Sequence, residues 1–319
     1  MKKKYLKIIG IFAILVVVLL GGFFVYKKNS KVSDENTIAP ILYEVTKKGS
    51  NNKMYLFGSI HMAKKEDLVF PEYIMDAYNN SHYLACEYNI VKANADFESA
   101  QEIAEKMFYQ DGSTILNYIS GDTYVKLVRF LKGKNLYNSF YDYYKPVFFY
   151  SLMSNVIGND ANLKSEAGID EYFINKAITD NKEILEVESM QLQMDLLLGF
   201  SDSLYELAIN DIIDNYDDNV KELVDLYANW KSGNEKAMIE LNDEDMAVKE
   251  NYTEEQKEEI NEFNRQMVND RNKTMTDKAI EYFNNNQDVF FMVGTLHIIG
   301  EDGIANRLQK EGYIVKRVN

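Results

Sequence analysis

Near the end of the chain, the pattern of hydrophobic and polar positions contains an apolar stretch at residues 289–293. Its β-branched and aromatic side chains predict a buried strand. Gly294 ends the stretch, and His297 follows three residues later. Beyond it, an acidic first turn, apolar residues one turn apart and a glycine stop signal predict a helix over 301–311, and a second strand follows at 313–315.

The same pattern occurs near the beginning of the chain. Residues 54–57 predict a strand, Gly58 ends it, and His61 follows three residues later. A helix over 71–78, opened by a proline, leads to another strand at 82–88. The two Gly-x-x-His units lie 236 residues apart (297 minus 61), and the chain has only three histidines. Two such units in matching contexts indicate a shared role more strongly than either unit alone.

These elements predict an α/β fold with a central sheet built from two β-(Gly-x-x-His)-α-β units. The first unit is preceded by a strand that pairs with it as a β-hairpin, and a further short strand lies at 184–187. The rest of the chain has mainly helical periodicity, which indicates a large α-helical insertion. The sheet is expected from 40–90, about 165–190 and 287–318, the insertion from about 95–165 and 189–286, and the whole domain from 40–319.

A membrane anchor is predicted near the N-terminus, where residues 8–26 are uncharged and almost wholly apolar. As a helix this segment would span about 28 Å, close to the thickness of a bilayer core. A cleaved signal peptide is the alternative, but the segment lacks a small-x-small cleavage site. We expect residues 1–31 to form a cytoplasmic leader and a single transmembrane helix, and residues 32–39 to form a linker. The lysine-rich leader favours a single-pass protein of the cell membrane with its domain outside the cytoplasm.

The charge of the chain changes sharply after this segment. Residues 1–31 contain seven lysines and no acidic residue, so the remainder carries 28 basic and 50 acidic side chains, a formal charge of −22 (28 minus 50). This excess of acid argues against nucleic acid and against an anionic membrane surface as partners. The single cysteine, Cys86, can form no intrachain disulfide, and core packing is its expected role.

Candidate chemistry lies at the predicted strand ends, where open α/β sheets place their ligand sites. His61 and His297 follow two strands, and three carboxylates are candidates to join them: Glu87, which ends the strand after the first unit, Glu188 and Asp170. Two histidines with a carboxylate match the ligand set of a divalent metal site. The glycine before each histidine allows the backbone to approach the site closely. The third histidine has no such context, and a structural role is expected for it.

A buried arginine is predicted in the last long helix. That helix starts at a capping box, 253–256, and runs toward residue 284. Arg271 lies in the middle of its apolar stripe, whose other members are Ile260, Phe263, Met267, Met275 and Ala279. Because a buried arginine requires a partner, we expect a carboxylate to face it, with Glu188 and Asp170 as the candidates.

Taken together, these motifs resemble the TraB/PrgY/GumN family, which includes the Tiki-type membrane proteases. The resemblance covers residues 40 to 318, nearly all of the chain beyond the predicted anchor. The segments that carry it are Leu56 to His61, Leu84 to Glu87, Gly168 to Asp170, Glu186 to Ser189 with Gln193, Arg271-Asn272 with Met275, and Val293 to His297 with Gly300 to Gly303.

The resemblance implies a divalent-metal-dependent hydrolase fold related to erythromycin-esterase-like enzymes. In this chain it implies that His61, Glu87 and His297 form the metal or catalytic set, with manganese, cobalt or zinc as possible ions. Glu87 would then be either a metal ligand or the general base. The resemblance gives Arg271 a supporting or substrate-binding position; as a candidate catalytic residue it would either stabilise the oxyanion or simply hold a carboxylate in place. The remaining residues expected to bind substrate or support the site are Asp170, Glu188, Gly58 and Gly294.

Two functional hypotheses follow. In the first, the protein is a membrane-anchored metallopeptidase that cleaves a peptide or surface protein outside the cytoplasm. In the second, it is a non-catalytic binder that sequesters a secreted peptide, with the aromatic helical residues 95–160 as its groove. The paired histidines favour the enzyme, because binding alone does not require them. Hydrolysis of a non-peptide ester is a third option that rests on fold analogy.

Overall fold

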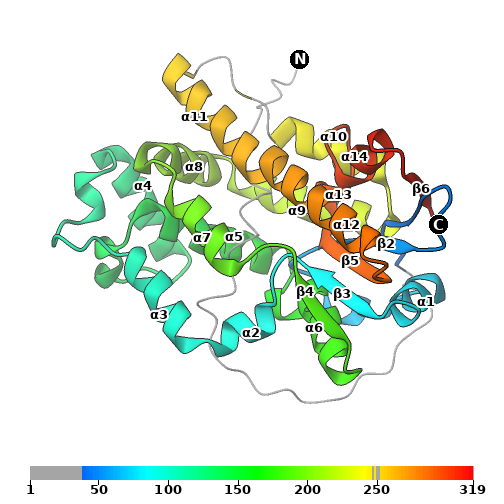
Figure 1. The fold of residues 1–319 in the computed structure, drawn as a ribbon. Coiled ribbons are helices and arrows are strands. Elements are labelled where there is room, and N and C mark those ends of the chain that lie inside the picture. Colours follow the sequence, from blue (N-terminus) through cyan, green and yellow to red (C-terminus); the bar gives the residue numbers. More distant parts are fainter. Residues whose placement is uncertain (1–37, 246–247, 249–251, 319) are drawn as a thin grey trace.

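The computed structural model describes residues 38–245, 248 and 252–318 (Figure 1). Within these residues, six strands form one sheet in the order β4-β3-β5-β2-β1-β6. The strands are β1 (Leu42–Thr46), β2 (Met54–Ser59), β3 (Tyr83–Cys86), β4 (Glu183–Glu186), β5 (Val289–Gly294) and β6 (Ile314–Arg317). The expected α/β class and the expected strands are therefore present.

The helices are distributed between the sheet and a separate helical part of the chain. Those near the sheet are α1 (Glu72–Asn79), α6 (Ile169–Thr179), α12 (Arg271–Asn284), α13 (Thr295–Ile298) and α14 (Ile304–Lys310). The others are α2 (Ile90–Ala95), α3 (Phe97–Lys106), α4 (Gly121–Gly133), α5 (Pro146–Asp160), α7 (Met190–Leu198), α8 (Asp202–Asp214), α9 (Tyr216–Ser232), α10 (Glu235–Asp245) and α11 (Glu254–Asn264). Short helical turns are η2 (Lys65–Asp67), η3 (Ile115–Asn117), η4 (Ser139–Tyr143) and η5 (Ser165–Ala167).

The direction of the strands decides where the functional side chains meet. Strand β5 lies between β2 and β3 and is parallel to both, and β4 continues the parallel set. Ser59 at the end of β2 is paired with Gly294 at the end of β5. The carboxyl ends of these strands therefore lie at one edge of the sheet. Strand β1 is antiparallel to β2, as the hairpin pattern predicts, and it is also antiparallel to β6 on its other side.

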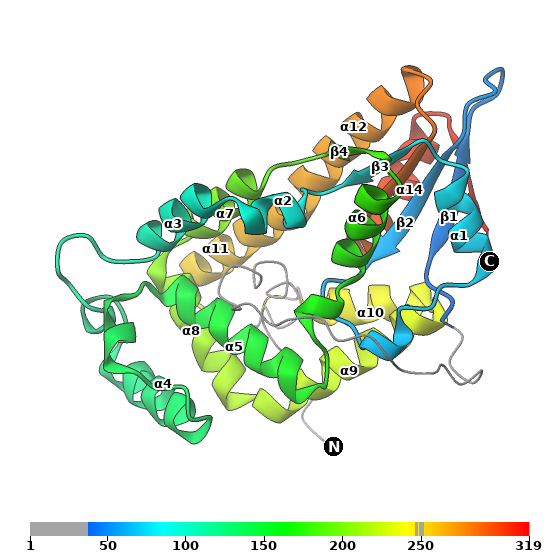
Figure 2. The ribbon, with the colours of Figure 1, turned by 90° about the horizontal axis from the view of Figure 1, so that it is seen from below.

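Both faces of the central strand are covered. Successive strand residues point to opposite faces, so Phe290 packs toward Phe173 of α6 at a ring-centroid distance of 5.2 Å. Its neighbour Phe291 faces Tyr282 of α12 at 6.4 Å. The two views show α1 and α6 on one side of the sheet and α12 with α14 on the other (Figures 1 and 2). This double burial explains the uninterrupted apolar run of β5.

The helical insertion leaves the sheet from its carboxyl edge. Helix α2 follows β3 and α7 follows β4, and the chain returns to the sheet through the long run of α11 and α12 (Figure 2). Aromatic residues in the insertion pack mainly on one another, as with Tyr144 and Phe148, whose ring centroids are 4.1 Å apart. Cys86 is buried and free, in agreement with a packing role.

Three local features differ from the sequence-based expectations. The helix expected to start at residue 301 begins only at Ile304, after Gly303, so its acidic residues precede the helix. His297 lies in the one-turn helix α13, an element that the sequence pattern did not predict. The long C-terminal helix is interrupted by a π-helical segment, η6 (Arg265–Asp270), which separates α11 from α12. In such a segment each hydrogen bond spans five residues instead of four, a feature that sequence periodicity does not reveal.

The N-terminal expectations concern residues that the structure does not describe. The leader and anchor, 1–31, and most of the predicted linker, 32–39, lie outside the described residues. Among the residues that are described, no helix is both long and apolar enough to cross a membrane.

Gly58 allows β2 to approach the segment after β5, so its replacement should destabilise the fold. A Cβ atom at this position would lie 3.1 Å from Thr295 Cα, and it would also meet Thr295 Oγ1. We expect Gly58→Ala to lower the free energy of unfolding by about 1–3 kcal/mol in urea titrations. Gly121→Ala is the matched control, because no atom lies within 4 Å of its added Cβ. Equal stability of the two variants would contradict the packing role of Gly58.

Candidate active site

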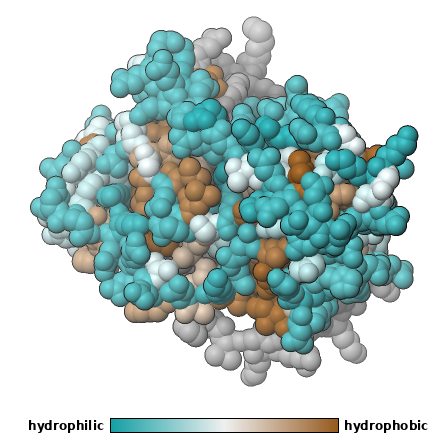
Figure 3. Space-filling view, in the orientation of Figure 1, coloured by the Kyte–Doolittle hydropathy of each residue, from teal (hydrophilic) through white to brown (hydrophobic). Residues whose placement is uncertain are grey.

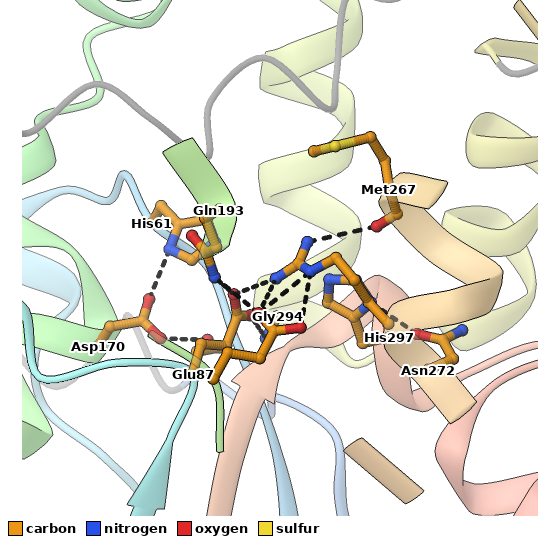
Figure 4. Close-up of polar contacts among 11 residues, drawn as sticks. His61, Glu87, Asp170, Gln193, Met267, Asn272, Gly294 and His297 are labelled. Atoms are coloured by element: carbon orange, nitrogen blue, oxygen red, sulfur yellow. Dashed lines mark hydrogen bonds and ion pairs between the residues drawn. The ribbon is translucent and has the colours of Figure 1, made fainter. Parts of the chain in front are cut away.

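His61 is held by a carboxylate from a different part of the sheet edge. It lies in the bend after β2, and its Nδ1 is 2.9 Å from Asp170 Oδ2 at the start of α6 (Figure 4). The other oxygen, Asp170 Oδ1, accepts a hydrogen bond of 2.7 Å from Ser59 Oγ. One oxygen of Asp170 thus accepts a hydrogen bond and the other forms an ion pair with His61, which orients the imidazole. Since Nδ1 faces Asp170, the opposite ring nitrogen, Nε2, is the one available to a reactant.

His297 is held in the same way by an amide. Its Nδ1 lies 2.6 Å from Asn272 Oδ1, and Asn272 Nδ2 donates to the carbonyl of Asp302 at 3.0 Å. The second contact orients the amide so that its oxygen faces the imidazole, which makes Nδ1 the protonated nitrogen. His297 is 1 % exposed. In this tautomer Nε2 carries the lone pair.

The two histidines converge on Glu87 and Gly294. A Cβ atom built on Gly294 would lie 3.4 Å from Glu87 Oε1, 3.5 Å from His297 Cδ2 and 3.8 Å from His61 Nε2. The backbone N–H of Gly294 donates to Glu87 Oε1 at 2.9 Å. The side chains of His61, Glu87 and His297 therefore surround one small space, which only a residue without a Cβ leaves open.

Arg271 supplies the positive charge that compensates the two buried glutamates of this site. Its Nη2 lies 2.7 Å from Glu87 Oε2 and 2.9 Å from Glu188 Oε2, and its Nε donates to Glu188 Oε1 at 3.0 Å (Figure 4). Gln193 Nε2 donates to both carboxylates, at 2.9 and 3.0 Å. All four side chains are buried. Because the guanidinium and amide saturate the carboxylate oxygens, the burial of the two acids is compensated.

The surroundings drive the pKa values of the two histidines in opposite directions. Burial lowers the pKa of His61, but Asp170 and then Glu87 outweigh it and raise the pKa to about 8. Burial and the positive charge of Arg271 lower the pKa of His297 to about 3. Burial would raise the pKa of Glu87, yet Arg271 and both histidines hold it well below its usual range. Near neutral pH, the site therefore contains a protonated His61, a neutral His297 and an ionised Glu87.

The structure brings most of the expected residues together, with one reassignment. Glu188 faces Arg271, as expected, but Asp170 does not: it pairs with His61, and Glu87 is the second partner of Arg271. The reason is that α6 begins beside the chain at His61, where the N–H of Ile169 donates to the carbonyl of Ile60 at 3.0 Å.

Three supporting residues were given no role from the sequence. They are Ser59, Gln193 and Asn272, which hold Asp170, the two glutamates and His297, respectively. Asn272 and Gln193 belong to the motifs quoted above, but spacing alone does not indicate which side chain a polar residue will contact. Gly58 contacts Thr295 rather than the space between the histidines.

The donor set only partly suits a divalent metal ion. Both imidazoles have Nδ1 bound by an acceptor, as in histidines that bind metals through Nε2. Glu87, however, already accepts bonds from Arg271, Gln193 and Gly294, and the guanidinium is itself a cation. Within the part of the chain that the structure describes, no three His, Cys, Asp or Glu side chains are arranged to hold a metal. The residues as placed do not fit a three-ligand site, and the metal stays a prediction from the resemblance.

The fold and the site define an α/β protein with paired Gly-x-x-His segments at the carboxyl edge of its sheet. The chain belongs to the TraB/PrgY/gumN family, whose model matches residues 41–317. This match includes every residue of the site. Comparisons with curated proteins and with solved structures gave no significant match.

Removal of the guanidinium should destabilise the domain strongly. Arg271→Ala leaves two buried carboxylates without their cation, and the loss of one partner of such a cluster costs about 3–5 kcal/mol. Urea titration should show this loss. Adding Glu87→Gln and Glu188→Gln to the Arg271→Ala variant should recover part of the lost free energy of unfolding, because the neutral amides need no cation. Arg265→Ala, which removes an exposed ion pair with Glu262 in the same helical run, should change stability little. Equal effects of the two arginine substitutions would contradict the proposed burial.

The Asp170–His61 pair should make stability fall as the pH rises. The folded pKa of His61 is raised to about 8, above its unfolded value of about 6.5. Its contribution, about 2 kcal/mol, is therefore complete below pH 6.5 and is lost as the pH passes 8. Urea titrations between pH 6 and 9 should show this decline, and Asp170→Asn should reduce it. Asp288→Asn, which alters the exposed pair with His82, should leave the decline intact. If the free energy of unfolding falls equally with pH in the parent, Asp170→Asn and Asp288→Asn, the decline does not come from the Asp170–His61 pair.

Proposed function

We propose that the protein is a hydrolase, with His297 as general base and His61 as general acid. The observation that carries this proposal is the convergence of the two histidines on one space, with their Nδ1 atoms bound by Asp170 and Asn272. Two groups of one residue type, whose environments separate their pKa values, provide an acid and a base at the same pH. Membership of the TraB/PrgY/gumN family agrees with the proposal without specifying an activity.

The proposed reaction is the attack of water on a carbonyl carbon. His297 Nε2 takes a proton from the water as its oxygen bonds to the carbon. The tetrahedral intermediate collapses when the bond to the leaving nitrogen or oxygen breaks and His61 Nε2–H donates a proton to that atom. His297 then returns its proton to solvent and His61 regains one, so that charge and atoms balance. Asp170 keeps His61 protonated between cycles because it stabilises the imidazolium.

Glu87 and Arg271 have a supporting part in this proposal. Arg271 is held by two carboxylates and a backbone carbonyl, Met267 O at 3.3 Å, so it positions Glu87 rather than contacting the substrate. The negative charge of Glu87 lies next to both imidazoles. At His297 it partly offsets burial and the charge of Arg271, which disfavour the cationic form that this histidine acquires when it accepts a proton.

The proposed substrate is a peptide or surface protein outside the cytoplasm. Support comes from the uncharged segment at residues 8–26, which follows a lysine-rich leader, and from the strongly acidic remainder of the chain. The histidine pair provides acid and base but no strong nucleophile, which is suited to direct attack by water.

A second candidate is a binder that sequesters a secreted peptide without cleaving it. The observation in its favour is that Arg271, Gln193 and Gly294 already engage both oxygens of Glu87, so this carboxylate is not free to act on a substrate. Turnover separates the two candidates, because a binder would show none.

Substitution of either site histidine should abolish hydrolysis. We expect His61→Ala and His297→Ala of the full-length protein in detergent to lower kcat about 10²–10⁴-fold on a mixture of fluorogenic peptides. His82→Ala is the matched control: its side chain is 78 % exposed and pairs only with Asp288 among the described residues. Metal analysis of the same preparations tests the expected cofactor. If all three variants retain the activity of the parent, or if the parent has none, the hydrolase proposal fails.

A further inference from the structure

A groove of about 600 Å³ lies on the surface between α7 and α11. This volume is within the range of ligand-binding pockets. Its floor is apolar and is formed by Leu192, Leu196, Phe200 and Leu204. Leu192 is 43 % exposed, although it is a large hydrophobic residue. In the space-filling view, apolar side chains gather in a patch over α7, with hydrophilic residues around it (Figure 3).

The groove is built from regular faces of two helices. On α7, Leu192, Asp195 and Leu196 follow the i, i+3, i+4 spacing of a single face. On α11, Glu258 and Glu262 are one turn apart and face the groove. The two walls are joined at one end, where Ser201 Oγ donates to Glu259 Oε1 at 2.6 Å. A groove on such paired helices is already formed without a ligand.

The rim of the groove is acidic. Among the described residues that line it, four are carboxylates, Asp195, Glu258, Glu259 and Glu262, and none is basic. Glu262 is paired with Arg265 at 2.6 Å, and Asp195 is 3.5 Å from Lys106. Glu258 makes no hydrogen bond or ion pair with any described residue. An excess of negative charge therefore faces a partner in the groove, beyond what the described residues neutralise.

The walls of the groove also carry residues of the active site. Helix α7 contributes Leu192 to the groove and the adjacent Gln193 to Glu87. On the other wall, Gln266 lines the groove, and the carbonyl of Met267 accepts from Arg271. The groove and the site therefore share two supporting helical segments.

We propose that this groove binds a basic, amphipathic stretch of polypeptide, in which lysine or arginine alternates with large apolar residues. The apolar side chains cover the floor, and the cationic ones meet the carboxylate rim. The assignment of the stretch as part of a substrate rests on the proposed hydrolase function; the binding itself does not. A polyamine would satisfy the rim but leave the floor exposed to water, so it is not the ligand proposed.

Binding of short labelled peptides to the full-length protein in detergent tests this inference by fluorescence anisotropy. The first probe is (Lys-Leu)₄. In the second, serine replaces leucine, and in the third, glutamate replaces lysine. The variants are Glu258→Lys and, as matched control, Asp277→Lys, an exposed carboxylate on α12 outside the groove. We expect the parent to bind the first probe at least tenfold more tightly than either of the others.

The two charge reversals distinguish binding in the groove from a general attraction of the acidic protein for basic peptides. We expect Glu258→Lys to raise the Kd of the first probe at least fivefold and Asp277→Lys to change it less than twofold. Equal effects of the two substitutions, equal Kd values for the leucine and serine probes, or competition by spermine as effective as by the unlabelled first peptide would overturn the inference. Tight binding of the first probe by a parent protein that hydrolyses no peptide would overturn the proposed hydrolase and leave this inference standing.

Discussion

The arrangement of the site depends on the buried ion cluster of Arg271 with Glu87 and Glu188. The two carboxylates follow the ends of neighbouring parallel strands, where each would be destabilised by its own burial and by the charge of the other. The arginine that compensates them belongs to the long helical run that returns from the insertion to the sheet. This cluster therefore joins the helical insertion to the carboxyl edge of the sheet and fixes the carboxylate on which the two histidines converge.

The same cluster makes the two Gly-x-x-His units chemically different. In the sequence the units are alike, and each histidine follows a strand and a glycine. In the fold, Asp170 supports the cationic form of His61, whereas Arg271 disfavours it at His297. The two copies of the motif thus hold imidazoles in different protonation states, which the proposed mechanism uses as acid and base, because they meet different charges. Gln193 lies on α7, one wall of the acidic groove, and Arg271 begins α12, which continues the helical run of α11. The proposed peptide groove and the site therefore share supporting helices.

Much of this architecture could be predicted from the sequence. The apolar run of β5 indicated a strand buried on both faces, and parallel strands bring their following residues to one edge, as His61 and His297 require. Burial of Arg271 followed from its place in an apolar stripe. Its choice of Glu87 over Asp170 could not be predicted, since both carboxylates lie at strand or helix ends and only the packing of α6 decides between them. The π-helical segment and the groove depend on contacts between distant helices, which periodicity does not specify.

The protonation states of the two site histidines test the central claim most directly. With only three histidines in the chain, nitrogen chemical shifts of the imidazoles can be assigned from single alanine substitutions and followed from pH 4 to 9 by NMR. The structure predicts that His61 titrates near pH 8 and that His297 stays neutral, with its proton on Nδ1, over this whole range. Titration of both histidines near pH 6.5 would contradict an acid–base pair built by Asp170 and Arg271.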